Sequence, residues 1–225
     1  MNPVKYVRMK ICCIGSLEEA KLAISYGASA IGLVSSMPSG PGPIPEELIA
    51  TIAAGIPPGI ATVLLTSSQN AADIIRQHFA TRTNTIQIVD QFPSGGYRLL
   101  RQALPAVKLV QVIHVQNEAS TEVAVEAARH VDAILLDSGN LNLSIKELGG
   151  TGRVHDWFIS KSIRETIKIP VYLAGGLRPE NVAQAIQAVG PFAVDVCSGV
   201  RTNGTLDEEK LSAFVGAVRR ANERG

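Results

Sequence analysis

Short apolar runs rich in β-branched residues alternate with amphipathic stretches along the whole chain. Runs of the first kind predict strands, and stretches with apolar residues three or four positions apart predict helices. The predicted strands are 8–13, 30–34, 60–65, 84–89, 108–115, 132–136, 170–173 and 193–197. The predicted helices begin near residues 17, 45, 70, 95, 119, 157, 179 and 206. This alternation, with no linker-like interruption, predicts an α/β fold in which residues 1–225 form a single (β/α)8 TIM barrel with parallel strands.

Several predicted helix starts carry their own sequence signals. Ser16 with Glu19, and Thr205 with Glu208, fit the Ser/Thr-x-x-Glu capping box, in which two side chains satisfy free backbone N–H groups. Pro179 suits the first turn of a helix, where no backbone N–H is needed. These signals support helices after the first, seventh and eighth predicted strands.

In a barrel of this kind, reactive groups belong at the carboxyl ends of the strands. The first predicted strand ends in Cys12 and Cys13, two of the three cysteines in the chain. Because side chains alternate along a strand, Lys10 and Cys12 are predicted to face the lumen, and Ile11 and Cys13 the helices. Cys12 is therefore a candidate for chemistry, although most free cysteines are simply small buried apolar side chains.

The sixth predicted strand leads into Asp137, an acid at the rim of an apolar run. Its side chain is predicted to share a face with Leu135 and to enter the mouth of the barrel opposite Cys12. Burying a carboxyl group is costly without a task or a partner, so Asp137 is a candidate acid or else a helix cap or ion-pair partner. The long segment 138–157 follows it, and its GGTG run includes Gly150, where backbone can approach a substrate closely.

The last two units predict a phosphate site. Gly175 and Gly176 follow the seventh predicted strand, and Ser198 and Gly199 follow the eighth. Glycine-rich turns leave backbone N–H groups free to bind an anion, and barrels of this class often bind phosphate there. The alternative is that both are plain tight turns.

Composition excludes several classes of partner. The chain has 21 basic and 20 acidic residues, so it lacks the charge excess that attracts nucleic acid or anionic membranes. Its longest apolar stretch, 48–65, is interrupted by glycine and proline and does not predict a membrane span. Three cysteines make no disulfide framework, and the first residues show no secretory pattern, so we expect a cytoplasmic protein. The oligomeric state is not predicted.

Together the motifs resemble the phosphoribosylanthranilate isomerase family of tryptophan biosynthesis. The resemblance runs through KIC at 10–12, LLDS with GGTGRVHDW at 135–157, LAGGLRPENV at 173–182 and VDVCSGV at 194–200. It implies a single (β/α)8 domain with no metal and no organic cofactor, acting on a phosphorylated small molecule. It also implies that Cys12 is the general base and Asp137 the general acid, and it places Asp195 near the sugar or amine. The alternative for Asp195 is an ion pair with luminal Lys10, and the two roles are compatible.

The implied reaction is an Amadori rearrangement of an N-(5-phosphoribosyl) arylamine, an aldose–ketose isomerisation. Ring opening needs a protonated carboxyl group, and the apolar setting of Asp137 is expected to raise its pKa. Proton removal from C2 needs a thiolate, so the pKa of Cys12 should fall below about 8.5. We expect Lys10, on the same face of the strand, to supply the positive charge that favours the thiolate.

Four positions depart from the family pattern. Pro41 stands where the family has an arginine that holds the anthranilate carboxylate, and Val89 stands where it has a histidine. Cys13 replaces a glycine and Cys197 a serine, and both are expected to be small packing residues.

Other charged or polar residues are candidates for the missing contacts. Arg153 and Arg178 are candidate replacements for the arginine, although each is also a plausible surface charge. His114, at the end of the fifth predicted strand, either contacts substrate or is a satisfied buried side chain.

Two rival functions remain at this point. Lys10 in the lumen predicts, as an alternative, an aldolase or lyase that forms a Schiff base with a sugar phosphate. The other alternative is a non-catalytic barrel that binds a phosphorylated metabolite. The presence of both Cys12 and Asp137 argues against the second.

Overall fold

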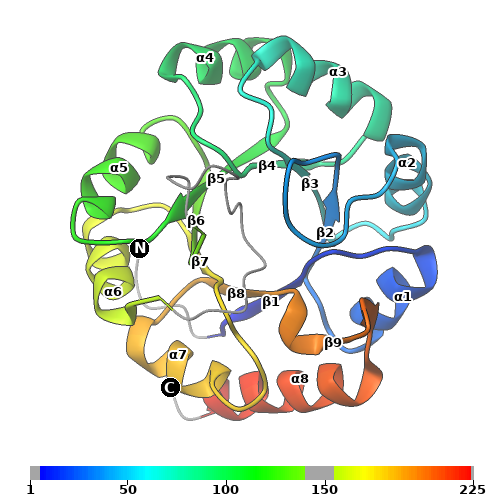
Figure 1. Ribbon diagram of the computed structural model, residues 1–225, viewed down its shortest axis with the longest axis vertical. Helices are drawn as coiled ribbons and strands as arrows, with labels where there is room; N and C mark the ends of the chain where they lie inside the picture. Colours follow the sequence, from blue (N-terminus) through cyan, green and yellow to red (C-terminus); the bar gives the residue numbers. More distant parts are fainter. Residues whose placement is uncertain (1–5, 140–154, 224–225) are drawn as a thin grey trace.

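The computed structural model describes residues 6–139 and 155–223, and in it eight parallel strands close into a barrel surrounded by helices (Figure 1). The strands pair in the order in which they occur in the sequence, and β8 returns to pair with β1. Their bounds are β1 Arg8–Ile11, β2 Ala30–Val34, β3 Ala61–Thr66, β4 Thr85–Ile88, β5 Lys108–His114, β6 Ala133–Asp137, β7 Val171–Leu173 and β8 Ala193–Val196. The predicted fold class is confirmed.

A helix follows each of these strands along the chain. The helices are α1 Leu17–Ser25, α2 Glu46–Ala54, α3 Ala71–Thr81, α4 Ser94–Ala103, α5 Ser120–Ala127, α6 Trp157–Thr166, α7 Val182–Val189 and α8 Glu208–Glu223. A short 3-10 helix, η1 Ser198–Val200, and a two-stranded ribbon of β9 Arg201–Thr202 and β10 Thr205–Leu206 lie between β8 and α8. None of the described helices is long and apolar enough to cross a membrane.

Helix starts differ from the sequence prediction at α7 and α8. Helix α7 begins at Val182, so Pro179 lies in the turn before it. The predicted capping box at Thr205 is wrong, because Thr205 pairs in the β9–β10 ribbon and Asp207 instead accepts the N–H of Lys210. A hairpin thus takes up the residues that the local pattern assigned to the start of α8.

The α1 start follows the prediction in part. Ser16 Oγ accepts the N–H of Glu19 at 3.2 Å, as an N-cap residue does. The Glu19 carboxylate does not complete a capping box, because it accepts the N–H groups of Gly15 and Leu206 at 2.9 and 2.8 Å. Glu19 therefore joins the start of α1 to the ribbon after β8.

The barrel has two separate apolar layers. The larger lies between strands and helices and includes Ile11, while the smaller fills the lumen and includes Cys12. This confirms that Cys12 faces inward, and Lys10 does so too, because a Cβ on Gly32 would meet both Cys12 Sγ and Lys10 Nζ. Cys13 also belongs to the luminal layer, so its predicted helix-facing position is wrong. Strand β1 ends at Ile11 and Cys13 has φ of 60°, so strand alternation no longer applies there.

Candidate active site

A cavity opens at the carboxyl ends of the strands and brings together six of the nine residues predicted from sequence. Its lining includes Cys12, Asp137, Asp195, Gly175, Gly176 and Ser198. Lys10 does not line the cavity, and Gly199 lines a neighbouring hollow that shares Gly176 and Ser198 with it. Gly150 falls outside the described residues. These predicted residues therefore lie together, at the carboxyl ends of β1, β6, β7 and β8.

Cys12 follows β1 at the floor of the cavity and is 5% exposed. Its backbone N–H donates to Val196 O at 2.8 Å, which fixes it against β8. A Cβ at Gly32 on β2 would lie 2.6 Å from Cys12 Sγ and 3.1 Å from Lys10 Nζ. Gly32 therefore makes room for the thiol and the ammonium side by side, a role that nothing in its apolar sequence run indicated.

The protonation state of Cys12 differs from the sequence expectation. Burial raises the pKa of the thiol to about 11, although Lys10 acts in the opposite direction. The predicted influence of Lys10 therefore has the right sign, but it is smaller than the desolvation of the thiolate. Without a further positive charge nearby, Cys12 is a neutral thiol.

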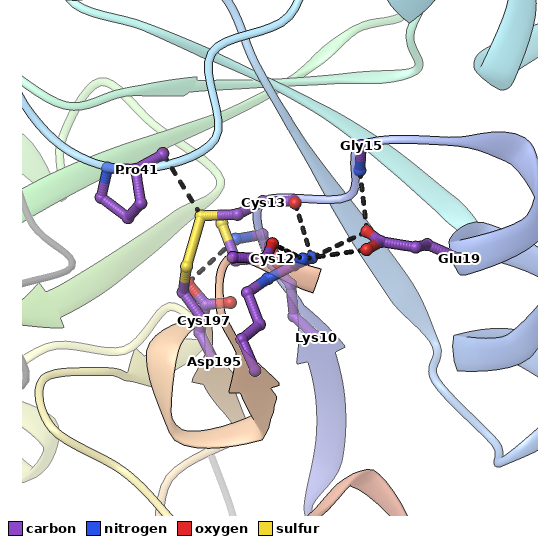
Figure 2. The surroundings of a disulfide bond; sticks show 10 residues. Lys10, Cys12, Cys13, Gly15, Glu19, Pro41, Asp195 and Cys197 are labelled. Carbon is purple, nitrogen blue, oxygen red and sulfur yellow. Dashed lines mark hydrogen bonds and ion pairs between the residues drawn. A yellow bond between two sulfur atoms is a disulfide. The ribbon is translucent and has the colours of Figure 1, made fainter. Parts of the chain in front are cut away.

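Lys10 forms an ion pair with Asp195, and Nζ lies 2.9 Å from Oδ2 (Figure 2). Burial alone would lower the pKa of Lys10, but the negative charge of Asp195 more than offsets this and holds it above the usual value. Asp195 Oδ1 is buried and has no hydrogen-bond partner among the described residues. Asp195 also lines the cavity.

Asp137 ends β6 and is 8% exposed. Burial raises the pKa of its carboxyl group, although the N–H of Ser138, which donates to Oδ1 at 2.7 Å, acts against this. The sequence prediction that the pKa of Asp137 is raised is therefore confirmed in direction.

His114 lies beside Asp137 in the β5–β6 register, but its Nε2 bonds Val89 O at 2.9 Å and it does not line the cavity.

The glycine turns after β7 and β8 pack directly against each other. Gly175 and Gly176 have φ of 83° and 62°, which side-chain-bearing residues rarely adopt. A Cβ on Gly199 would collide with the carbonyl oxygen of Leu177. Among the described residues, none accepts the backbone N–H of Gly176, Ser198 or Gly199. These closely packed turns form a cradle with free backbone donors.

The opposite wall of the cavity is mainly apolar. Its members come from the ends of β2, β3 and β4 and from the segment after β2: Val34, Met37, Pro41, Leu65 and Val89. Gln87 of β4, which sequence analysis did not single out, adds an amide there. Among the described lining residues there is no arginine. Arg178 is exposed, with Nε 3.7 Å from Glu180, and Arg153 falls outside the described residues.

Cys13 and Cys197 are joined by a disulfide at the rim (Figure 2). The expectation that both are unpaired packing residues is therefore wrong. The left-handed backbone at Cys13 turns its side chain toward the end of β8, and the closing of the barrel brings together residues 184 positions apart. Cys12 stays free.

Within the described part of the chain, no cluster of three or more histidine, cysteine or acidic side chains is arranged to hold a metal ion. The cavity and its floor offer a thiol, two carboxyl groups, an ammonium group and backbone donors. Such a set can move protons and bind an anion.

Comparisons with known proteins agree over nearly the whole chain. A family model for N-(5'-phosphoribosyl)anthranilate isomerase matches residues 9–217. The chain is 33% identical to N-(5'-phosphoribosyl)anthranilate isomerase 1 of Methanosarcina mazei, over 96% of both chains. The crystal structure of phosphoribosyl anthranilate isomerase from Thermotoga maritima superposes with a TM-score of 0.81 and 30% identity, covering 95% of this chain and 99% of that one. A phosphoribosyl anthranilate isomerase in complex with reduced 1-(o-carboxyphenylamino)-1-deoxyribulose 5-phosphate gives a TM-score of 0.78 at 29% identity, covering 95% and 99%.

Proposed function

The chain belongs to the N-(5'-phosphoribosyl)anthranilate isomerase family, and from that premise we propose that Asp137 and Cys12 are the acid and the base of its reaction. The protein is an isomerase of tryptophan biosynthesis. Its substrate, N-(5'-phosphoribosyl)anthranilate, undergoes an Amadori rearrangement to the corresponding 1-amino-1-deoxyribulose 5-phosphate. The observation that carries the residue assignment is that Cys12 and Asp137 line one cavity beside a glycine cradle.

Asp137 protonates the ring oxygen of the ribose in the first step. The C1–O bond then breaks, and the nitrogen lone pair forms a protonated Schiff base at C1. This step requires a carboxyl group that still holds its proton near neutral pH. The raised pKa of Asp137, caused mainly by burial, supports this role.

Cys12 removes the proton from C2 in the second step, which gives an enolamine that tautomerises to the ketose. A neutral thiol cannot do this, and the resting pKa of about 11 keeps Cys12 protonated. The Schiff base formed in the first step carries a positive charge that, together with Lys10, lowers the pKa of the nearby thiol. The order of the two steps thus explains why a buried cysteine serves as the base.

The cradle of Gly175, Gly176, Ser198 and Gly199 holds the phosphate of the substrate. Its free backbone N–H groups and its close packing support this role. Asp195 contacts the sugar or the amine through Oδ1. The apolar wall that includes Met37 and Pro41 packs on the aromatic ring.

The aldolase alternative is disfavoured by the environment of Lys10. A Schiff-base lysine must lose its proton to attack a carbonyl. Lys10 is 1% exposed and ion-paired with Asp195, and its pKa is raised. The role of Lys10 is therefore electrostatic.

The protein acts in the cytoplasm on a phosphorylated small molecule, with neither nucleic acid nor membrane as a partner.

Rescue of tryptophan auxotrophy in an isomerase-deficient strain tests this proposal. The parent chain should restore growth, and Cys12→Ser and Asp137→Asn should not. Purified variants should lose at least about 100-fold in kcat, the usual contribution of a general acid or base. Retention of parental kcat by either variant would refute its assigned role, and failure of the parent to rescue would refute the activity.

A further inference from the structure

We propose that Cys13 and Cys197 are a reversible dithiol–disulfide site that sets the affinity of the cradle for phosphate. The pair is oxidised by exchange with an external disulfide and reduced by exchange with external thiols. The effect on phosphate rests on the proposed function of the cradle, whereas the redox chemistry of the pair does not. Neither cysteine belongs to the proposed acid–base pair.

The geometry of the pair suits repeated formation and opening of the bond. The Cα atoms lie 5.9 Å apart, within the usual range for a disulfide. Cys13 adopts a left-handed backbone, with φ of 60°, which is unfavourable for a residue with a side chain. That conformation carries its sulfur to the end of β8. The residue is thus held where the bond can form.

The position of the pair favours exchange at Cys197. Both cysteines line the cavity, but Cys197 is partly exposed whereas Cys13 is only 7% exposed. A small thiolate therefore reaches the sulfur of Cys197 first. Cys12 does not compete, because its sulfur lies over Gly32 on the floor of the cavity and its thiol is protonated.

The bond ties together three segments of the rim. Cys13 directly follows Cys12, and Cys197 directly precedes the 3-10 helix η1, which begins with Ser198. The segment after β2 contacts the same disulfide, because Cys13 Sγ lies 3.5 Å from Pro41 O. A Cβ on Gly42 would lie only 2.6 Å from Cys13 Cβ. Opening the bond therefore releases the end of β8, next to the cradle.

The rest of the barrel does not depend on this bond. Strands β1 and β8 stay paired from Arg8 with Ala193 to Ile11 with Val196. Arg201 also donates to the carbonyl oxygens of Cys12 and Cys13, which holds the end of β1. Reduction should therefore loosen the segment around Ser198, after β8, more than the segment around Cys12, after β1. The expected change is in phosphate affinity, with the turnover number little altered.

The exchange is balanced in atoms and electrons. Oxidation converts two thiols and one external disulfide into the Cys13–Cys197 disulfide and two external thiols. A mixed disulfide on Cys197 is the intermediate, and the Cys13 thiolate then displaces the external thiol. Two electrons pass to the external disulfide, and reduction by a dithiol runs the same steps backwards.

Redox buffers of reduced and oxidised dithiothreitol test the proposal. After equilibration, the protein is denatured, alkylated with iodoacetamide and weighed by mass spectrometry. We expect one labelled cysteine, Cys12, at the oxidising end and all three at the reducing end, with full reversal. Inorganic phosphate, titrated by calorimetry, should bind about fivefold more weakly to the reduced protein.

Cys13→Ser and Cys197→Ser provide matched controls. Each should bind phosphate equally in both buffers, with the affinity of the reduced parent. Three labelled cysteines at every buffer ratio, or oxidation of Cys12 in place of Cys13, would refute the redox site. Equal or undetectable phosphate binding in both parent forms would refute its control of the cradle. These readouts need no turnover, so absence of isomerase activity would count against the proposed function alone.

Discussion

Lys10 Nζ lies 2.9 Å from Asp195 Oδ2 inside the lumen, where Lys10 is almost fully buried. The register of β1 and β8 places the two residues directly opposite each other. Two opposite charges in an apolar interior offset each other's desolvation, so each depends on the other. The pair also keeps a positive charge beneath the thiol of Cys12, as the effect of Lys10 on its pKa indicates.

Lys10→Met should destabilise the protein by about 3 kcal/mol, because it leaves the Asp195 carboxylate buried without a cation. Urea unfolding at pH 8 measures this change. The double variant Lys10→Met with Asp195→Asn should recover most of the loss, since it buries no unpaired charge. If the double variant were no more stable than Lys10→Met, the ion pair would not be the cause.

The same substitution should slow alkylation of the Cys12 thiol. Lys10 lowers the pKa of that thiol, so its removal leaves less thiolate at any given pH. The reaction of iodoacetamide with the Cys13→Ser, Cys197→Ser background isolates Cys12 and measures the rate. An unchanged rate would show that Lys10 does not act on the thiol.

Asp137→Asn should stabilise the protein at pH 8 but not near pH 3.5. Asp137 has a native pKa raised above its usual value of 3.8, so the folded state resists ionisation and the parent loses stability as pH rises through that native pKa. The amide cannot ionise and avoids this loss. The gain should be about 1.4 kcal/mol for each unit by which the pKa is raised.

Asp132→Asn is the matched control and should show the opposite sign. Burial alone would raise the Asp132 pKa, but hydrogen bonds from Leu109 N–H and Arg101 hold it below its usual value. Its stabilising contribution is therefore present above the unfolded pKa and lost as pH falls, so Asp132→Asn should destabilise at pH 8 and have little effect in acid. Parallel pH profiles for the two variants would contradict the assigned shifts.

Much of the site follows from strand periodicity together with the closure of the barrel. The alternation of side chains correctly placed Lys10 and Cys12 in the lumen, and the apolar run before Asp137 correctly indicated a raised pKa. Such features depend on neighbours within a few residues or on the overall fold. They are therefore visible in one sequence.

The features that were missed depend on the local backbone conformation, on burial, or on contacts between distant segments. Cys13 was assigned to the wrong face because β1 ends two residues before it and the chain then turns left-handed. Its bond to Cys197 joins residues 184 positions apart. The balance between burial and Lys10 at Cys12 required the actual depth of the thiol. A sequence pattern carries none of these distances.

Arg201→Met should weaken both the fold and the placement of Cys12. Arg201 Nη2 lies 3.0 Å from Glu19 Oε2 and donates to Cys13 O at 2.6 Å, and both charged groups are largely buried. Losing one partner should cost about 3 kcal/mol in urea unfolding. Because the end of β1 also loses a donor, kcat should fall, and Arg201→Lys should restore part of it.

Arg76→Met is the control for that substitution. Its ion pair with Glu46 is exposed to solvent, so its loss should change stability by less than about 1 kcal/mol and leave kcat unchanged. If Arg201→Met and Arg76→Met behaved alike, the Arg201–Glu19 pair would have no special part in holding β1.

Gly199→Ala should raise KM for the phosphorylated substrate at least about tenfold with a smaller change in kcat. A Cβ there would collide with Leu177 O, so the two turns of the cradle must move apart and their N–H groups lose alignment. Gly95→Ala is the control, because nothing lies within 4 Å of the position that its Cβ would occupy in α4. Alanine should there stabilise the helix by up to about 1 kcal/mol without affecting KM. Initial-rate kinetics decide the matter: an unchanged KM in Gly199→Ala would mean that the phosphate is bound elsewhere.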